Sequence, residues 1–256
     1  MAVTAEQTLG RMRWPEVTAD DGRPAPVLLV PVGSLEQHGP ALCLATDALV
    51  AAHAAQRAAA RLAGGGQRFL VAPVVPCGAS GEHEGFPGTL SVGHDALHLL
   101  LVELARSACR WAQGVVFVNG HGGNVATIVD VVSQLRAEGR GVAWTACRVP
   151  GDDAHAGRAE TSLMLVVAPE TVLVDRLEPG CTDPVADLVP RLRSEGVRAV
   201  SPNGVLGDPT TASRELGRRL IGDLVDRLVA ELSDIDVGAH GRLRRPDRVD
   251  APVTIR

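Results

Sequence analysis

Short apolar runs alternate along the chain with longer segments in which apolar residues recur every three to four positions. Four runs are continuously apolar and bounded by Pro, Gly or polar residues, which is typical of strands buried on both faces; they are residues 26–33, 68–76, 114–120 and 141–148. Five segments have the spacing or the Ala-rich composition of helices; they are residues 47–63, 93–112, 124–139, 159–168 and about 210–233. Because strands and helices alternate, we predict an α/β fold, a three-layer α/β/α sandwich with a mainly parallel sheet.

No internal repeat, low-complexity segment or shift of composition marks a linker between domains. A length of 256 residues suits one large domain, so we predict a single domain over residues 1–256, with an N-terminal segment (1–24) and a C-terminal tail (235–256). Residues 175–207 are Pro-rich and have no clear period. We predict that they form a long loop with a functional or interfacial role.

The composition is that of an ordinary globular protein, with 45% hydrophobic and 21% charged residues and a net charge of −5. A negative net charge without a basic stripe argues against nucleic acid as a partner. No apolar stretch approaches the roughly 20 residues that cross a bilayer, so we expect no membrane association. The five cysteines form no CxxC pair and the N-terminus lacks the apolar core of a secretion signal, so we expect a cytoplasmic protein.

Residues with candidate chemistry are concentrated directly after the four predicted strands. The segments that follow these strands read GSLEQHG, CGASGEHEGFPGT, NGHGGN and VPGDDAHAGRAETS. The carboxyl ends of parallel strands meet at one edge of the sheet, where ligands bind. We therefore expect the carboxylates and imidazoles of these segments to converge on one site; they are Glu36, His38, Glu82, His83, Glu84, His121, His155 and Glu160.

Carboxylates mixed with imidazoles, without thiolates, are typical of a site for Zn, Mn or Fe(II). Glu36 and His38 are two residues apart, so an extended backbone would direct both side chains to the same side. Asp47 opens a predicted helix, where it could bridge two ions or instead cap the helix N-terminus. His121 stands in a glycine-rich turn that would let a substrate approach the backbone closely.

Four motifs in this order resemble those of the creatininase family of metal-dependent amidohydrolases. The motifs are PVGSLEQHGPALCLATD, GEHEGFPGTLS, NGHGGN and HAGRAETS; they span about residues 27–168, and SPNGVLGDPTTAS (201–213) extends the similarity. The resemblance implies a three-layer α/β/α fold with one or two divalent ions per subunit, Fe²⁺ or Zn²⁺ or else Mn²⁺, at the strand ends. It also implies a homo-oligomer, either a hexamer or an octamer.

The resemblance also implies roles for individual residues. The implied metal ligands are Glu36, His38, Asp47, His121 and Glu160, with Asp47 as the bridge. Glu160 also counts among the catalytic residues, together with His155, which either protonates the leaving amine or only orients its neighbours. The residues expected to bind substrate are Glu82, His83, Gly122, Gly123 and Asn124.

The glycines after His121 distinguish this chain from the creatinine hydrolases, which resemble it up to NGH but continue with a bulky aromatic residue and a metal-binding Glu. The open turn and the SPNGVLGDPT segment are most similar to the mycofactocin-system members of the family. Those are peptidases that release a C-terminal dipeptide from the ribosomal precursor peptide of a redox cofactor, which implies a modified precursor peptide as substrate. The alternative is a hydrolase of a small cyclic or formyl amide.

A non-catalytic nucleotide-binding module is a third interpretation, from a different functional class. It is disfavoured because no predicted strand is followed by GxGxxG or by a P-loop motif. The sequence therefore favours a metal-dependent amide hydrolase.

Overall fold

The computed structural model describes residues 7–18, 22–149 and 153–245, so the predicted N-terminal segment (1–24) and C-terminal tail (235–256) lie partly outside the described residues. Four described strands form one sheet in the order β2-β1-β3-β4, and every neighbouring pair is parallel. The strands are β1 (Val27–Val32), β2 (Phe69–Val71), β3 (Gly114–Asn119) and β4 (Val142–Ala146). The four predicted strands and the parallel sheet are thus confirmed.

β2 is shorter than the predicted strand over residues 68–76. Pro73 and Pro76 have no N–H group to donate to the ladder, which ends regular pairing in a strand. Pairing with β1 resumes only at one isolated bridge, between Val32 and Val75. The chain after β2 therefore leaves the sheet early and enters the loop that carries Glu82.

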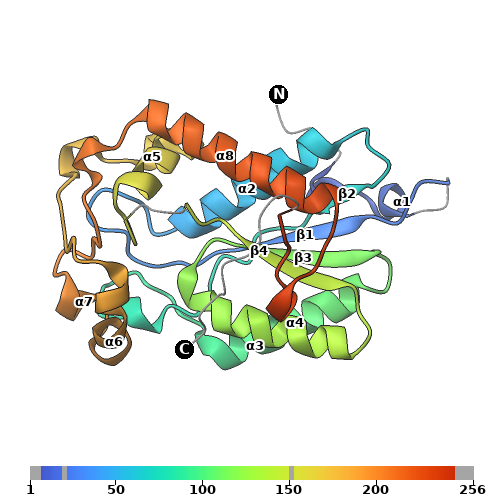
Figure 1. Cartoon of the computed structure of the whole chain (residues 1–256), viewed down its shortest axis with the longest axis horizontal. Coiled ribbons are helices and arrows are strands. Elements are labelled where there is room, and N and C mark those ends of the chain that lie inside the picture. Colours follow the sequence, from blue (N-terminus) through green and yellow to red (C-terminus); the bar gives the residue numbers. More distant parts are fainter. Residues whose placement is uncertain (1–6, 19–21, 150–152, 246–256) are drawn as a thin grey trace.

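Helices cover both faces of the sheet, as the alternating pattern predicts (Figure 1). One face carries α2 (Thr46–Leu62), α5 (Arg158–Val167) and α8 (Arg214–Ser233), and the other carries α3 (Gly93–Ala108) and α4 (Val125–Ala137). A one-turn helix, α1 (Trp14–Val17), precedes the first strand. No helix of the described residues is long and apolar enough to span a bilayer.

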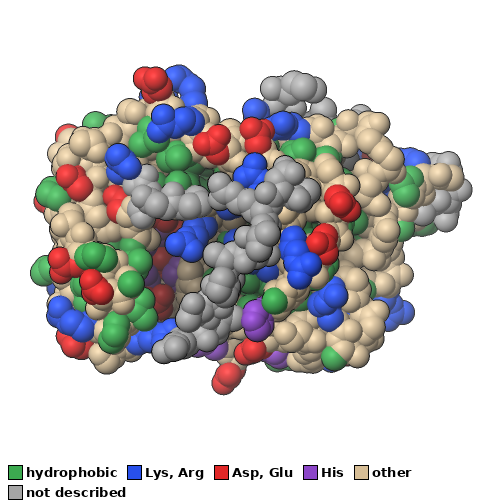
Figure 2. All heavy atoms as spheres, viewed as in Figure 1, with side chains coloured by type: hydrophobic (Ala, Val, Ile, Leu, Met, Phe, Trp, Pro, Cys, Tyr) green, Lys and Arg blue, Asp and Glu red, His purple; other side chains and the backbone are tan. Residues whose placement is uncertain are grey.

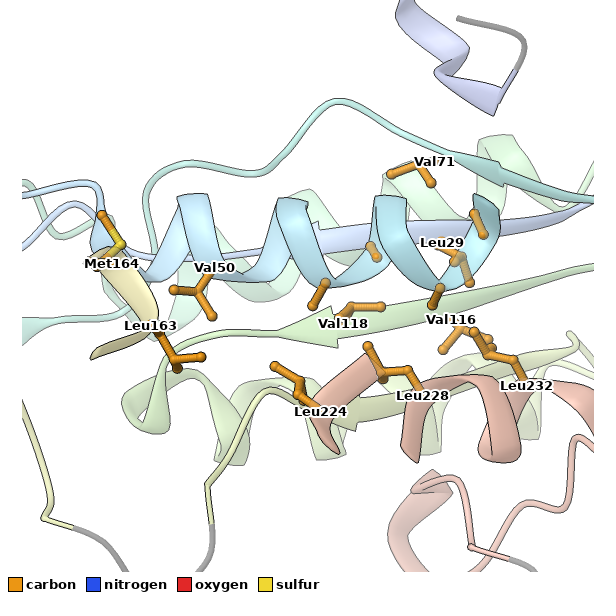
Figure 3. Close-up of a cluster of buried hydrophobic side chains, with 14 of the residues drawn as sticks. Leu29, Val50, Val71, Val116, Val118, Leu163, Met164, Leu224, Leu228 and Leu232 are labelled. Carbon is orange, nitrogen blue, oxygen red and sulfur yellow. The ribbon is translucent and has the colours of Figure 1, made fainter. Parts of the chain in front are cut away.

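Successive residues of β1 point to opposite faces of the sheet and supply two separate hydrophobic clusters. Leu29 packs with Val118 and with Leu228 of α8 in the cluster drawn in Figure 3. Leu28 packs with Phe117 and the α3–α4 layer in the other cluster. The two clusters fix the sheet between its helical layers and so hold the ends of the strands together.

The prediction of a loop over residues 175–207 is wrong in part, because this stretch contains α6 (Val185–Glu195) and α7 (Val197–Val200). Leu188 of α6 and Val197 of α7 are buried in a small hydrophobic cluster with Leu206. Pro184 precedes the first turn of α6, where a missing N–H group breaks no helical hydrogen bond. Pro190 lies inside α6, which forms in spite of it. Proline content alone therefore hid a helical pair.

A buried carboxylate joins α8 to the sheet on the side of β4. Glu231 is 3% exposed and accepts a hydrogen bond of 2.6 Å from the hydroxyl of Thr145. Arg227 lies 3.8 Å from the other carboxylate oxygen and also donates to the carbonyl of Arg148. Burial raises the pKa of Glu231 above its ordinary value of 4.5, although Thr145 and Arg227 oppose this shift.

Replacement of Glu231 by Gln tests how much the burial of this ionised carboxylate lowers the free energy of unfolding. Below pH 4.5 the carboxyl group is protonated in both states; above that value the unfolded chain ionises first, so wild-type stability falls as the pH rises through the raised folded pKa. Gln does not ionise. We therefore expect the free energy of unfolding of Glu231→Gln, relative to wild type, to increase from about pH 4 to about pH 7 in urea titrations. The exposed carboxylate Glu215 of the same helix provides the control, and parallel pH profiles for wild type and Glu231→Gln would contradict the prediction.

Candidate metal centre

Glu36, His38 and Asp47 are brought together by the path of the chain between β1 and α2. Gly33 lets the loop after β1 lie directly against α2, since a Cβ atom there would be 2.4 Å from the Cα atom of Ala48. The loop then turns inward, and its two ligand-type side chains meet the first turn of the helix. Glu36, His38 and Asp47 are 0%, 1% and 3% exposed. The N-cap residue of α2 is Ala45 rather than Asp47, and the Asp47 carboxylate faces His38 and His121.

Two groups of ligand-type atoms meet at Asp47. In the first, His121 Nδ1 lies 3.2 Å from Glu36 Oε2 and 3.3 Å from Asp47 Oδ2. In the second, His38 Nε2 lies 3.4 Å from Asp47 Oδ1 and 3.9 Å from Glu160 Oε2. Within each group the ligand-type atoms lie within 4.8 Å of one another. Asp47 directs one carboxylate oxygen to each group, which is the arrangement expected of a bridging ligand.

Three buried atoms of this cluster have no hydrogen-bond partner among the described residues: Glu36 Oε1, His38 Nε2 and Asp47 Oδ2. Each buried polar atom without a partner costs about 1–3 kcal/mol, and native proteins leave few of them. A cation would interact favourably with all three. The oxygen and imidazole donors suit Zn²⁺, Mn²⁺ or Fe²⁺, so the residues present fit a divalent metal.

The imidazoles and carboxylates strongly perturb one another. Burial alone would raise the pKa of Glu36, but the neighbouring imidazoles, His121 first, hold it well below its ordinary value. Burial alone would lower the pKa of His38, but the neighbouring carboxylates, Asp47 first, raise it to about 10. Burial raises the pKa of Glu160 to about 7. A metal must therefore displace protons from this cluster, so metal affinity falls as the pH falls.

His155 lies beside both groups and forms a third group of ligand-type atoms with Glu36 and His38. Its Nε2 atom is 2.9 Å from the carbonyl oxygen of Gln37, which can only accept, so Nε2 carries the ring proton. Its Nδ1 atom is 3.8 Å from Glu36 Oε1. Burial, with the charges of His38 and His83, lowers the pKa of His155 well below its ordinary value. His155 is therefore a neutral imidazole with an unprotonated Nδ1 atom facing the cluster.

The backbone around His155 forms hydrogen bonds with Leu206 of the segment 201–213 and with Glu160 of α5. Its N–H and C=O groups pair with Leu206, at 3.2 and 2.9 Å, which ties the loop before α5 to the segment 201–213. The next residue, Ala156, has a φ of 53°, an unusual conformation for a residue with a side chain. This turn directs the Ala156 N–H group to Glu160 Oε2 at 2.6 Å. The same turn thus orients both residues expected to be catalytic.

Gln37 is a residue of this site that the sequence interpretation missed. Its Nε2 atom lies 2.9 Å from His83 Nδ1 and 3.0 Å from His155 Nε2, and it donates to the carbonyl of Gly204 at 3.0 Å. Strand-like alternation would turn Gln37 away from its two neighbours, but the chain is no longer a strand here. The only sign in the sequence that Gln37 belongs to the site is its position between Glu36 and His38.

A cavity of about 1020 Å³ opens over the two groups. Its lining includes the expected site residues Asp47, Glu82, His83, His121, Gly122, Gly123, His155 and Glu160, and its facing wall comes from α6 and α7. Figure 2 shows histidine side chains in the depth of a hollow beside the α6–α7 part of the molecule. None of the described residues that line the cavity is Phe, Trp or Tyr, so they offer no aromatic wall for stacking a flat ring.

Asn124, one of the expected substrate-binding residues, does not line the cavity. It is fully buried, and its amide accepts a hydrogen bond of 2.9 Å from Ala79 N–H and donates one of 2.9 Å to Gly33 O. It also donates to the side chain of Asn119 at 3.3 Å. Asn124 thus connects the segments that follow β1 and β2 with the last residue of β3.

We expect Asn124→Ala to lower the free energy of unfolding by about 2–4 kcal/mol, because Ala79 N–H and Gly33 O lose their partners in a buried place. Urea denaturation measures the effect. Gln134, near the other end of α4, has an exposed side-chain hydrogen bond and provides the control for loss of an amide. A loss below about 0.5 kcal/mol in Asn124→Ala would show that the loops do not depend on this residue.

Metal addition provides a second test. A divalent ion that satisfies the orphaned atoms stabilises the folded state by about 2.7 kcal/mol at a free concentration of 100 times its Kd, so we expect the Tm of metal-free protein to rise on titration with Zn²⁺ or Mn²⁺. Asp47→Asn removes the carboxylate common to both groups and should remove most of this rise. Asp130→Asn, an exposed change on α4, should keep it. An equal rise in both variants would place the metal elsewhere.

The sequence of this chain is similar to a protein family and to named relatives. A family model described as Creatininase: Creatinine amidohydrolase matches residues 10–232. The chain is 54% identical over 226 residues to the mycofactocin precursor peptide peptidase of Mycolicibacterium smegmatis, covering 87% of each chain. It is 50% identical over 222 residues to the protein of the same name from Mycobacterium ulcerans, covering 85% of this chain and 89% of the relative.

Solved creatininases share the fold. One described with Mn has a TM-score of 0.72 and 30% identity, covering 86% of this chain and 95% of that one. A mutant creatininase described as of Zn–Zn type has a TM-score of 0.71 and 30% identity, covering 86% and 94%. The agreement of the family model, the relatives and the fold shows that this chain belongs to the creatininase family.

Proposed function

We propose that this protein is a metal-dependent peptidase of mycofactocin biosynthesis. It hydrolyses one amide bond of the modified ribosomal precursor peptide of this redox cofactor and releases a C-terminal dipeptide. The observation that carries the chemistry is the pair of ligand groups that share Asp47 on the floor of a cavity of about 1020 Å³. The relatives named mycofactocin precursor peptide peptidase support the choice of substrate.

The cavity itself supports a peptide more than a small flat ring. Its volume lies at the upper end of the roughly 300–1,000 Å³ that is usual for small-molecule sites, so it has room for several residues of an extended chain. Its facing wall is built from aliphatic and charged side chains of α6 and α7, among them Val189, Leu192 and Arg193. Such a wall offers contacts to peptide side chains and backbone.

The residues that would hold metal in this proposal are Glu36, His38, Asp47, His121 and Glu160, and Asp47 would be common to both ligand groups. The ions are Fe²⁺ or Zn²⁺, with Mn²⁺ as a further candidate; solved creatininases described with Mn and as of Zn–Zn type support a divalent metal. We also propose a single metallohydrolase domain that assembles into a homo-oligomer, a hexamer or octamer, in the cytoplasm. The family resemblance supports the assembly, and the sequence composition supports the location.

When bound, a divalent ion supplies Lewis-acid polarisation and water of lowered pKa to such a reaction. The residues of this chain position the substrate and move protons. His155 is neutral and presents Nδ1 beside Glu36, so it can accept a proton there and pass it to the leaving amine nitrogen. Glu160, whose pKa burial raises to about 7, would release any proton on binding the metal. The backbone carbonyl oxygen of Gln37, next to His155 Nε2, keeps the ring in this orientation.

The proposal is tested by mass spectrometry of a modified precursor peptide incubated with Fe²⁺- or Zn²⁺-loaded protein. We expect loss of the C-terminal dipeptide, no reaction after chelation, and recovery when metal is restored. Glu36→Ala and His121→Ala each remove a member of the first ligand group, so both should abolish hydrolysis and weaken metal binding while leaving the circular dichroism spectrum unchanged.

Glu84→Ala is the matched control, because Glu84 is an exposed carboxylate on the lining of the same cavity and belongs to neither ligand group. It should retain the metal-dependent reaction. Full activity of both ligand variants would contradict the assigned site. An intact peptide, together with turnover of cyclic or formyl amides by the same metal-loaded protein, would contradict the peptide substrate and favour the small-amide alternative.

A further inference from the structure

The two ring nitrogens of His121 face different carboxylates. Nδ1 faces Glu36 and Asp47 at 3.2 and 3.3 Å, inside the first ligand group. Nε2, on the other edge of the ring, lies 3.1 Å from the carbonyl oxygen of Ala79 and 3.5 Å from Glu82 Oε1. Because a carbonyl oxygen can only accept a hydrogen bond, Nε2 carries a proton. A metal would take the place of any proton on Nδ1, and Nε2 would keep its own.

Glu82 is placed to act on this ring rather than on the metal. It belongs to none of the groups of three ligand-type residues among the described residues. Its carboxylate lies at ion-pair distance from the protonated nitrogen, on the edge of the ring that faces away from Glu36 and Asp47. A carboxylate beside the N–H group of a ligating imidazole fixes the ring orientation and increases the basicity of the opposite nitrogen.

The glycine turn after His121 makes room for this contact. A Cβ atom at Gly123 would lie 2.4 Å from His121 Nε2, 2.5 Å from Ala79 O and 2.8 Å from Glu82 Oε1. Any side chain at position 123 would therefore displace the ring, the carbonyl or the carboxylate. A Cβ atom at Gly122 would meet nothing within 4 Å. Of the two glycines, only Gly123 is required by close packing around His121.

We propose that Glu82 is a positioning residue that fixes His121 for metal binding through the outer edge of its ring, and that Gly123 leaves the room in which the ring, the Ala79 carbonyl and the Glu82 carboxylate meet. The proposal rests on the proposed function in one respect, the assignment of His121 as a metal ligand. It assigns to Glu82 a role different from substrate binding. A carboxylate from the loop after β2 thereby supports a ligand from the loop after β3.

The test measures metal affinity rather than turnover, by competition with a chromophoric chelator for Zn²⁺ on purified full-length protein. Glu82→Ala is expected to weaken affinity roughly 10- to 100-fold, the range typical for loss of a residue that orients a metal ligand. Glu82→Gln keeps an acceptor oxygen beside Nε2 but lacks the charge, so its affinity should fall between Glu82→Ala and wild type. The Tm of the metal-free protein should change little in both variants, which separates a positioning role from a general loss of stability.

Two matched controls come from the same loops. Glu84→Ala removes an exposed carboxylate two residues away and should leave the affinity at the wild-type value. Gly123→Ala should weaken metal binding as much as Glu82→Ala, whereas Gly122→Ala, in open space, should not. Wild-type affinity in Glu82→Ala, or an equal loss in Glu84→Ala, would overturn the proposal. Loss of peptide cleavage with metal affinity intact would also overturn it, because Glu82 would then act on the substrate.

His121→Ala separates this proposal from the proposed function. If His121→Ala binds metal as tightly as wild type, the assigned metal site itself fails. If His121→Ala loses affinity and Glu82→Ala does not, only the role of Glu82 fails. The two failures are therefore distinguishable in one series of titrations.

Discussion

Burial of several carboxylates at one edge of the sheet is the constraint on which the rest of this structure depends. Glu36 and Asp47 are almost wholly buried, a few ångströms apart, and both carry charges of the same sign. Such an arrangement is unfavourable unless cations or imidazoles compensate it. His38 and His121 supply part of that compensation, and the orphaned atoms that remain mark where a metal would supply the rest.

The surrounding fold can be understood as the means of holding these charges in place. Two hydrophobic clusters clamp the central strands, so that the loops after β1 and β3 leave the sheet from fixed points. The amide of Asn124 then ties those exits to the loop after β2 by hydrogen bonds rather than by apolar packing. These hydrogen bonds fix the loops that carry the ligand-type side chains.

Much of the fold and the location of the site could be predicted from the sequence, because both follow from local pattern. Apolar runs with turn residues at their ends specify strands, and the convergence of strand exits follows from parallel topology. The pairing of Asp47 with both His38 and His121 agrees with the predicted bridge. By contrast, the places of Gln37, Glu82 and Asn124 depend on how irregular loops pack against one another. No period in the sequence encodes that packing. The helices α6 and α7 are missed for another reason, because the prolines before and within α6 and after α7 are typical of a loop.

The segment 201–213 connects two parts of the site that chain order keeps apart. Leu206 pairs through its backbone with His155 and packs through its side chain with α6 and α7. Leu206 therefore links the α6–α7 wall of the cavity to the backbone of His155. A ligand that contacts this wall would therefore touch a part of the chain whose packing also includes the residue that holds the backbone of His155.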